Sequence, residues 1–182
     1  GRFCVIAGGD HETSEQRLID LAHPDAPPRL VAAREEGVQY SIADRGDELF
    51  ILTNADGAID FKVVTAPLAA PERANWRDLI PYREGVYVLD VELYAGHMVR
   101  LERANALPAI IIRDLESGEE HAIAFDEAAY SLDTMGGYEF ETTNLRFSYS
   151  SMTTPAEVYD YDMATRARVL RKRQEIPSGH DP

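Results

Sequence analysis

Three short apolar runs decide the fold that this sequence predicts: Glu48-Leu49-Phe50-Ile51-Leu52, His97-Met98-Val99-Arg100-Leu101 and Leu145-Arg146-Phe147-Ser148-Tyr149. Their centres, Phe50, Val99 and Phe147, are 49 and 48 positions apart. A fourth run over residues 2–7 has Phe3 in the same phase, 47 positions before Phe50. A period of roughly 40–50 residues with several short strands in each repeat is typical of β-propeller blades. The sequence therefore predicts an all-β fold, a fragment of a β-propeller.

The strands within each repeat are predicted from alternating or continuous apolar runs that end at turn-forming residues. The repeat over residues 38–85 is the clearest, with strands expected at 38–43, 48–53, 61–66 and 76–80. The next repeat gives strands at 86–94, 97–102, 109–115 and 121–125. The last gives strands at 130–132, 145–149, 158–162 and 169–171. The sequence thus predicts about four blades, each an antiparallel sheet of up to four strands.

The first repeat is expected to lack its opening strand, because it begins directly with residues 2–7 and continues with 17–21 and 29–32. Gly8-Gly9 is interpreted as the hairpin turn of this repeat. Residues 15–21 are the best alternative helix, but the third strands of the later repeats favour β-structure. We expect blades near 1–37, 38–85, 86–128 and 129–175, further chain on the N-terminal side, and an exit linker at 176–182.

Composition and charge restrict the function. The 182 residues are 45% hydrophobic, enough for a compact core, and carry a net charge of −14. Nucleic acid is not an expected partner, since phosphate binding needs a basic stripe. A membrane span is not expected either, because no run of about 18 apolar residues occurs. The acidic surface is expected either to steer cationic peptides or merely to keep the protein soluble.

Individual polar residues give only weak signals of chemistry. Cys4 is the single cysteine, which favours a reducing, cytoplasmic setting, and it is expected to be buried in a strand. His11 and Glu12 lack the His-Glu-x-x-His spacing of a helical metal site, so neither a metal nor another cofactor is expected. Asp160 and Asp162 share one strand face, where a solvent-facing edge is favoured over acid–base chemistry.

Two further segments have structural interpretations. The hydroxyl-rich segment Ser150-Ser151-Met152-Thr153-Thr154 is interpreted as a strand end and turn. The basic run over residues 166–173 is interpreted as a solvated outer edge that resists pairing with another sheet.

Several phrases of the sequence resemble the propeller of the oligopeptidase B (protease II) family of serine peptidases. They are Asp10-His11-Glu12-Thr13-Ser14-Glu15, the segment from Leu52 to Lys62, Arg146 to Pro155, Val158 to Asp162, and Leu170 to Glu175. The resemblance covers essentially the whole chain, and its strength lies in the order and spacing of the phrases. It implies the last four or so blades of a seven-bladed propeller that caps an α/β-hydrolase domain.

The resemblance also implies a function for the parent protein. Members are cytoplasmic serine peptidases that cut short peptides after Arg or Lys, and the propeller filters out folded proteins. Their nucleophile lies on a Gly-x-Ser-x-Gly elbow, which does not occur here, so no catalytic residue is assigned. The acidic residues that hold the cationic side chain lie mainly in the peptidase domain, so none is assigned either.

Strand order within a blade gives the only candidate site residues. The opening strands are expected to line the central channel through Tyr40, Ser41, Tyr87, Val88, Tyr130 and Ser131. Two alternatives stay open at this stage. One is a stand-alone propeller-like module that binds proteins or peptides without enzymatic activity. The other is a dimer of the fragment formed through its open sheet edges.

Overall fold

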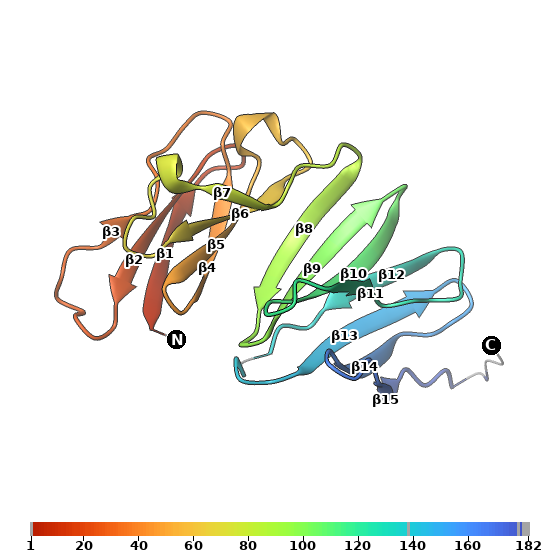
Figure 1. The fold of residues 1–182 in the computed structure, drawn as a ribbon. Helices are drawn as coiled ribbons and strands as arrows, with labels where there is room; N and C mark the ends of the chain where they lie inside the picture. The colour runs from red at the N-terminus through yellow and green to blue at the C-terminus, as the bar shows by residue number, and fades with distance from the viewer. Residues whose placement is uncertain (1, 138, 178, 180–182) are drawn as a thin grey trace. The chain divides into compact units, whose positions relative to one another are not determined.

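The computed structural model describes residues 2–137, 139–177 and 179. It divides into two compact units, Gly1–Gly85 and Val86–Pro182. All the sheets are antiparallel, and the helical segments of the described residues are two short 3₁₀ turns (Figure 1). The all-β prediction is therefore confirmed. Part of the expected exit linker, residues 178 and 180–182, lies outside the described residues.

The first unit contains a three-stranded sheet of order β1-β2-β3 and a four-stranded sheet of order β4-β5-β6-β7. Their elements are β1 (Phe3–Gly9), β2 (Ser14–Asp20), β3 (Arg29–Leu30), β4 (Tyr40–Arg45), β5 (Glu48–Thr53), η1 (Ala55–Gly57), β6 (Lys62–Pro67), η2 (Arg73–Asn75) and β7 (Arg77–Ile80). Residues 48–53, expected as a strand, form β5 with the predicted bounds.

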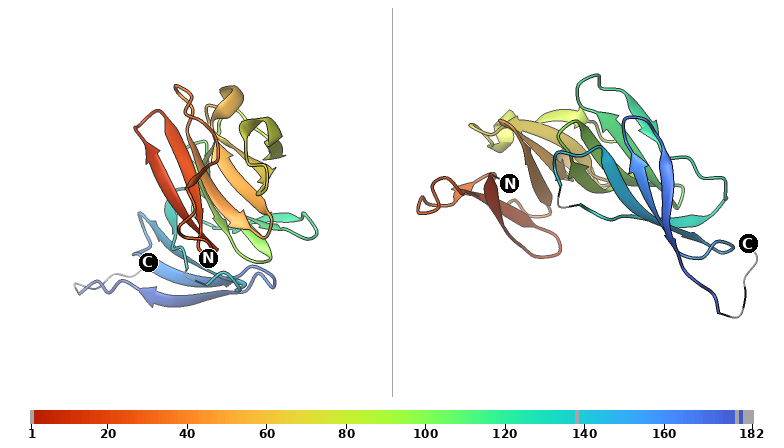
Figure 2. Two further views of the ribbon diagram at one scale, coloured as in Figure 1. Left: turned by 90° about the vertical axis from the view of Figure 1, so that its left-hand side faces the viewer. Right: turned by 90° about the horizontal axis from the view of Figure 1, so that it is seen from below.

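The second unit contains two four-stranded sheets, of orders β8-β9-β10-β11 and β12-β13-β14-β15. Their elements are β8 (Val86–Leu93), β9 (His97–Ala104), β10 (Leu107–Asp114), β11 (Glu120–Ala122), β12 (Tyr130–Thr134), β13 (Asn144–Ser151), β14 (Glu157–Asp162) and β15 (Arg168–Arg173). Figure 2 shows these strands from two further sides. In both units the strands of a sheet follow one another in chain order, as up-and-down blades do.

Each unit has its own apolar core, supplied by alternate residues of neighbouring strands. In the first unit it consists of Leu18, Val31, Ala32, Tyr40, Leu49, Ile51, Val64, Ala66 and Leu68. In the second unit it consists of Tyr94, Val99, Ile110, Ile112, Ile123, Leu132, Leu145, Phe147, Tyr149, Tyr161 and Met163. Burying one side chain the size of Ile110 contributes about 1.5–3 kcal/mol, so these faces are the main stabilising contacts within each unit.

The turn between β1 and β2 differs from the prediction. Gly8 and Gly9 belong to β1 and pair with Glu15 and Ser14, so they are not the hairpin turn. The chain reverses one step later, where Asp10 Oδ1 accepts hydrogen bonds from the backbone N–H groups of Glu12 and Thr13. Gly9 is needed for close packing, because a Cβ there would lie 2.4 Å from the Thr13 carbonyl oxygen. An Asx turn thus replaces the expected glycine turn.

Two burial predictions are wrong. Cys4 is exposed, because β1 is the outermost strand of its sheet in this structure and Val5 and Ile6 beside it are exposed as well. Asp160 is not solvent-facing: it is 5% exposed and lies under the guanidinium groups of Arg146 and Arg171. The basic edge is as expected, since every residue of β15 is exposed.

Candidate functional site

The six predicted channel residues lie on the opening strands β4, β8 and β12, each of which is an outermost strand of its four-stranded sheet. Ser41, Tyr87 and Ser131 are exposed, Tyr130 is half-buried, and Tyr40 and Val88 are buried. Because side chains alternate between the two faces of a strand, neighbouring residues cannot share one environment. That these six residues line a channel stays a prediction.

Tyr40 has a structural role inside the first unit. Its hydroxyl group donates a hydrogen bond to the Ala32 carbonyl oxygen (2.7 Å) and accepts one from the Gln16 backbone N–H (2.9 Å). Its ring meets the Trp76 ring edge-on, with centroids 5.4 Å apart. Burial, the largest cause, raises the pKa of Tyr40. The side chain therefore holds the two sheets of this unit together.

Carboxylates occur on all three opening strands, a feature that the strand-order argument missed. Asp44 lies on β4, Asp90 and Glu92 on β8, and Asp133 on β12, and both Asp90 and Asp133 are exposed. A β-bulge at Leu89 shifts the register of β8, so that Asp90 lies opposite Leu101. Bulges of this kind re-aim side chains at sheet edges, and this one changes the face to which Asp90 and Glu92 belong.

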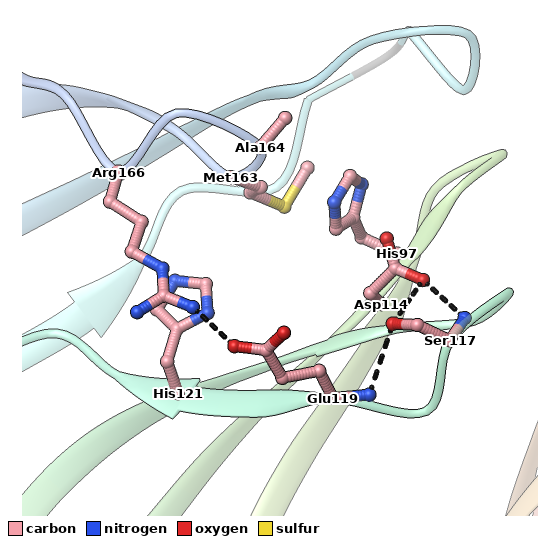
Figure 3. A pocket seen from close by; sticks show the side chains of 8 residues that line it. All are labelled: His97, Asp114, Ser117, Glu119, His121, Met163, Ala164 and Arg166. Carbon is pink, nitrogen blue, oxygen red and sulfur yellow. Dashed lines mark hydrogen bonds and ion pairs between the residues drawn. The ribbon is translucent and has the colours of Figure 1, made fainter.

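A small pocket of about 150 Å³ lies within the second unit (Figure 3). Its walls come from the first residue of β9, the last residue of β10, the β10–β11 turn, β11 and the β14–β15 turn. The lining residues are His97, Asp114, Ser117, Glu119, His121, Met163, Ala164 and Arg166. This grouping could not be predicted from the sequence, because its two histidines are 24 positions apart and their approach depends on strand register.

Polar contacts fix most of this pocket. Asp114 Oδ1 accepts hydrogen bonds from the Ser117 backbone N–H (2.7 Å) and hydroxyl group (2.9 Å), and these bonds lower the pKa of Asp114. Arg166 forms an ion pair with Glu119 at 2.6 Å. His121 Nε2 lies 3.1 Å from the Tyr161 hydroxyl group, and burial together with the nearby Arg166 charge lowers the pKa of His121. His97 Nδ1 is buried without a hydrogen-bond partner in the described part of the chain.

This pocket does not contain the elements of nucleophilic catalysis. The Ser117 hydroxyl group donates to the Asp114 carboxylate, whose lowered pKa makes it a poor acceptor for the serine proton, whereas an activated serine donates to a base that takes this proton. Across residues 2–137, 139–177 and 179, no three His, Cys, Asp or Glu side chains gather in a way that could hold a metal ion. The Ser151 hydroxyl group accepts hydrogen bonds from the backbone N–H groups of Thr153 and Thr154, which supports the interpretation of that segment as a turn.

Glu127 is a second residue that sequence reasoning missed. Its carboxylate accepts hydrogen bonds from the hydroxyl groups of Tyr149 (2.7 Å), Thr153 (3.0 Å) and Thr154 (2.6 Å). Hydrogen bonds from Ser151, Thr154 and Tyr149 lower the pKa of Glu127 to about 2. The carboxylate therefore stays ionised at neutral pH and ties the β13–β14 turn to the segment before β12.

Comparisons with known proteins agree with this architecture. The family described as "Prolyl oligopeptidase, N-terminal beta-propeller domain" matches residues 1–174. Dipeptidyl aminopeptidase BI of Pseudoxanthomonas mexicana is 38% identical over 180 residues, which are 99% of this chain and 24% of that protein. Protease 2 of Moraxella lacunata is 27% identical over 91% of this chain and 23% of its own length. The chain thus spans about a quarter of these relatives. None of its described residues forms a helix long and apolar enough to cross a membrane.

Solved structures give the same result. Oligopeptidase B from Trypanosoma brucei superposes with a TM-score of 0.92 at 30% identity, over 100% of this chain and 27% of that one. Oligopeptidase B from Leishmania major superposes with a TM-score of 0.91 at 26% identity, over 99% of this chain and 27% of its own. The repeat of strands, the four antiparallel sheets and the match over residues 1–174 lead to one assignment: the chain belongs to the N-terminal β-propeller domain of the prolyl oligopeptidase family.

Proposed function

We propose that this chain is the propeller part of a cytoplasmic serine-type oligopeptidase that hydrolyses short peptides after Arg or Lys. In this proposal the sheets admit and orient the peptide, and acyl transfer takes place in a peptidase domain elsewhere in the full-length protein. Family membership supports the general assignment, and the resemblance to two oligopeptidase B structures supports the finer one.

The observation that carries the preference for cationic peptides is the presence of a carboxylate on every opening strand. If these strands surround a channel, Asp90 and Asp133 contribute negative potential to it, and the chain as a whole carries a charge of −14. A passage lined by charge of one sign concentrates substrates of the opposite sign. Peptides containing Arg or Lys are therefore favoured over neutral or acidic ones.

A second candidate is removal of dipeptides from free N-termini. Its specific support is the 38% identity to a relative named dipeptidyl aminopeptidase BI, which exceeds the identity to the relative named protease 2. The two activities differ in one chemical requirement, because an aminopeptidase needs the free α-amino group of its substrate and an endopeptidase does not.

The deciding experiment measures kcat/KM of the full-length protein on three reporter substrates. They are an N-blocked Arg amide, the same compound with Ala in place of Arg, and a dipeptide amide with a free N-terminus. We expect the N-blocked Arg compound to be cleaved and the Ala compound to be poorer by about 100-fold or more, because the proposal places a charge contact to the Arg side chain in the peptidase domain. Cleavage restricted to the free dipeptide would establish the second candidate. Absence of cleavage of all three would favour a binding module.

A further inference from the structure

The turn over residues 151–154, between β13 and β14, carries the most exposed large apolar side chain among those described. Met152 is 95% exposed. A single exposed apolar residue is common on protein surfaces and does not by itself indicate a binding site. What distinguishes Met152 is the number of contacts that hold its backbone in place.

Two sets of hydrogen bonds immobilise this turn. Within the turn, Ser151 Oγ accepts from the backbone N–H groups of Thr153 (3.0 Å) and Thr154 (2.8 Å), and the Ser151 N–H donates to the Thr154 carbonyl oxygen (3.0 Å). From outside, Glu127 accepts from the hydroxyl groups of Thr153 and Thr154. Flexible loop tips lack such bonds, so the entropy of ordering this turn is already lost before any partner binds.

The turn lies at one end of the strands of the fourth sheet, the same end at which the chain leaves β15. Arg173, the last residue of β15, pairs with Glu157, the first residue of β14, and the Gln174 N–H donates to the Ala156 carbonyl oxygen. Two hollows of about 250 and 620 Å³ open at the same end of the strands, and Glu157 and Arg173 line both of them. A protruding side chain beside recessed surface is the shape of an interlocking interface.

We propose that the 151–154 turn is a preorganised docking element, with Met152 as its anchor, for the peptidase part of the full-length protein. This rests on the function proposed above. The occupant follows from two observations: the chain spans about a quarter of its relatives, and residues after Gln174 leave the sheet beside this turn. A methionine suits such an anchor, because its unbranched, polarisable side chain adapts to an apolar pocket.

The test replaces Met152 in the full-length protein with the photoreactive residue p-benzoylphenylalanine, followed by irradiation and mass spectrometry of cross-linked peptides. We expect cross-links that join position 152 to residues beyond this chain and within the same molecule. Met135 is the matched control, since it is also an exposed methionine. It lies at the opposite end of the strands of the same sheet, where its N–H donates to the Arg146 carbonyl oxygen. Its cross-links to the peptidase part should be several-fold fewer.

Three results would overturn the proposal. They are cross-links confined to this chain, cross-links no more abundant than those from position 135, and cross-links between isotopically distinct copies, which would identify a second copy as the occupant. As a second measurement, Met152→Glu should speed hydrogen exchange several-fold in the cross-linked peptidase segment, while exchange within this chain stays unchanged. Because neither readout uses a substrate, a wrong peptide specificity leaves both interpretable.

Discussion

At the scale of the residue, Asp160 shows how a carboxylate becomes part of the fold. Arg146 donates two hydrogen bonds to it, at 2.7 and 3.0 Å, and Arg171 donates a third at 2.6 Å. The hydrogen bonds from Arg146, and then the one from Arg171, hold the pKa of Asp160 well below its usual range. We expect Asp160→Asn to lower the free energy of unfolding by about 1–3 kcal/mol at pH 7, the range for hydrogen bonds to charged groups.

The pH dependence of that loss has a definite sign. A carboxyl group whose pKa is depressed in the folded state stabilises the protein above its unfolded pKa, near 4, and loses this contribution as the pH falls below it. The difference in the free energy of unfolding between wild type and Asp160→Asn, measured in urea, should thus be largest at pH 7 and should shrink below about pH 4. Asp133→Asn, at an exposed position of the same sheet, should show little difference at either pH. An equal loss in both variants would contradict the ion-pair explanation.

Residue-level burial was the least predictable feature of the sequence. Asp160 and Asp162 occupy alternate positions of their strand, which is the pattern of a solvent-facing side. The burial of Asp160 is favourable only because arginines of β13 and β15 pair with it. The residues on both sides of Cys4 are apolar, as in a core strand. Its burial nevertheless depends on whether another strand packs over it, and its own segment does not reveal this. His97 and His121 meet at one pocket for the same reason, because register brings them together and local sequence does not.

At the scale of the element, the third sheet contains an ion-pair cluster that joins three strands around the buried Arg100. Arg100 of β9, 1% exposed, donates to Glu102 Oε1 at 2.8 Å and binds Glu120 of β11 through two hydrogen bonds of 2.9 and 3.0 Å. Arg113 of β10 donates to the same Glu120. The hydrogen bonds from Arg100 lower the pKa of Glu120. A buried guanidinium of this kind is costly to remove, because its carboxylate partners stay behind.

We expect Arg100→Met to destabilise the protein by about 3–5 kcal/mol, measured by urea unfolding. Adding Glu102→Met should recover part of that loss, since the double variant no longer buries a carboxylate without its guanidinium. Arg113→Met is the matched control, because its side chain is 24% exposed, and it should cost at most about 1 kcal/mol. If Arg100→Met and Arg113→Met lowered the free energy of unfolding equally, the burial of Arg100 would make no additional contribution to stability.

Elements were predicted well where one segment contained its own signal. The continuous apolar run over residues 49–52, together with the turn residues on both sides, predicted the bounds of β5, since a strand buried on both faces reads as an uninterrupted apolar run. The bulge at Leu89 was not predictable, because an extra residue changes register without changing composition. The position of the β1–β2 turn differs from the prediction because Asp10, and not the Gly8-Gly9 pair, forms the turn: its side chain accepts a hydrogen bond from the Thr13 N–H.

At the scale of the whole molecule, the spacing of about 48 residues was sufficient to predict four successive sheets. That spacing is a strong signal because each repeat must build one sheet that buries its faces against its neighbours. The proposed function adds that the opening strands surround a passage, which acts as a filter for the substrate. Filtering by size makes a prediction that simple weakening of the enzyme does not make.

The last prediction places bulk on an opening strand of the full-length protein. Ser131→Trp adds a large side chain at an exposed position of β12, and Ala122→Trp adds the same side chain at an exposed position of β11, at the far edge of the third sheet. If opening strands surround the passage, Ser131→Trp should lower kcat/KM for a decapeptide about tenfold, a barrier change of about 1.4 kcal/mol, and leave an Arg amide reporter nearly unchanged. Ala122→Trp should alter neither substrate. Equal losses for both substrates would mean that Ser131→Trp disturbs the fold or the catalytic machinery, and the filter would have to lie elsewhere.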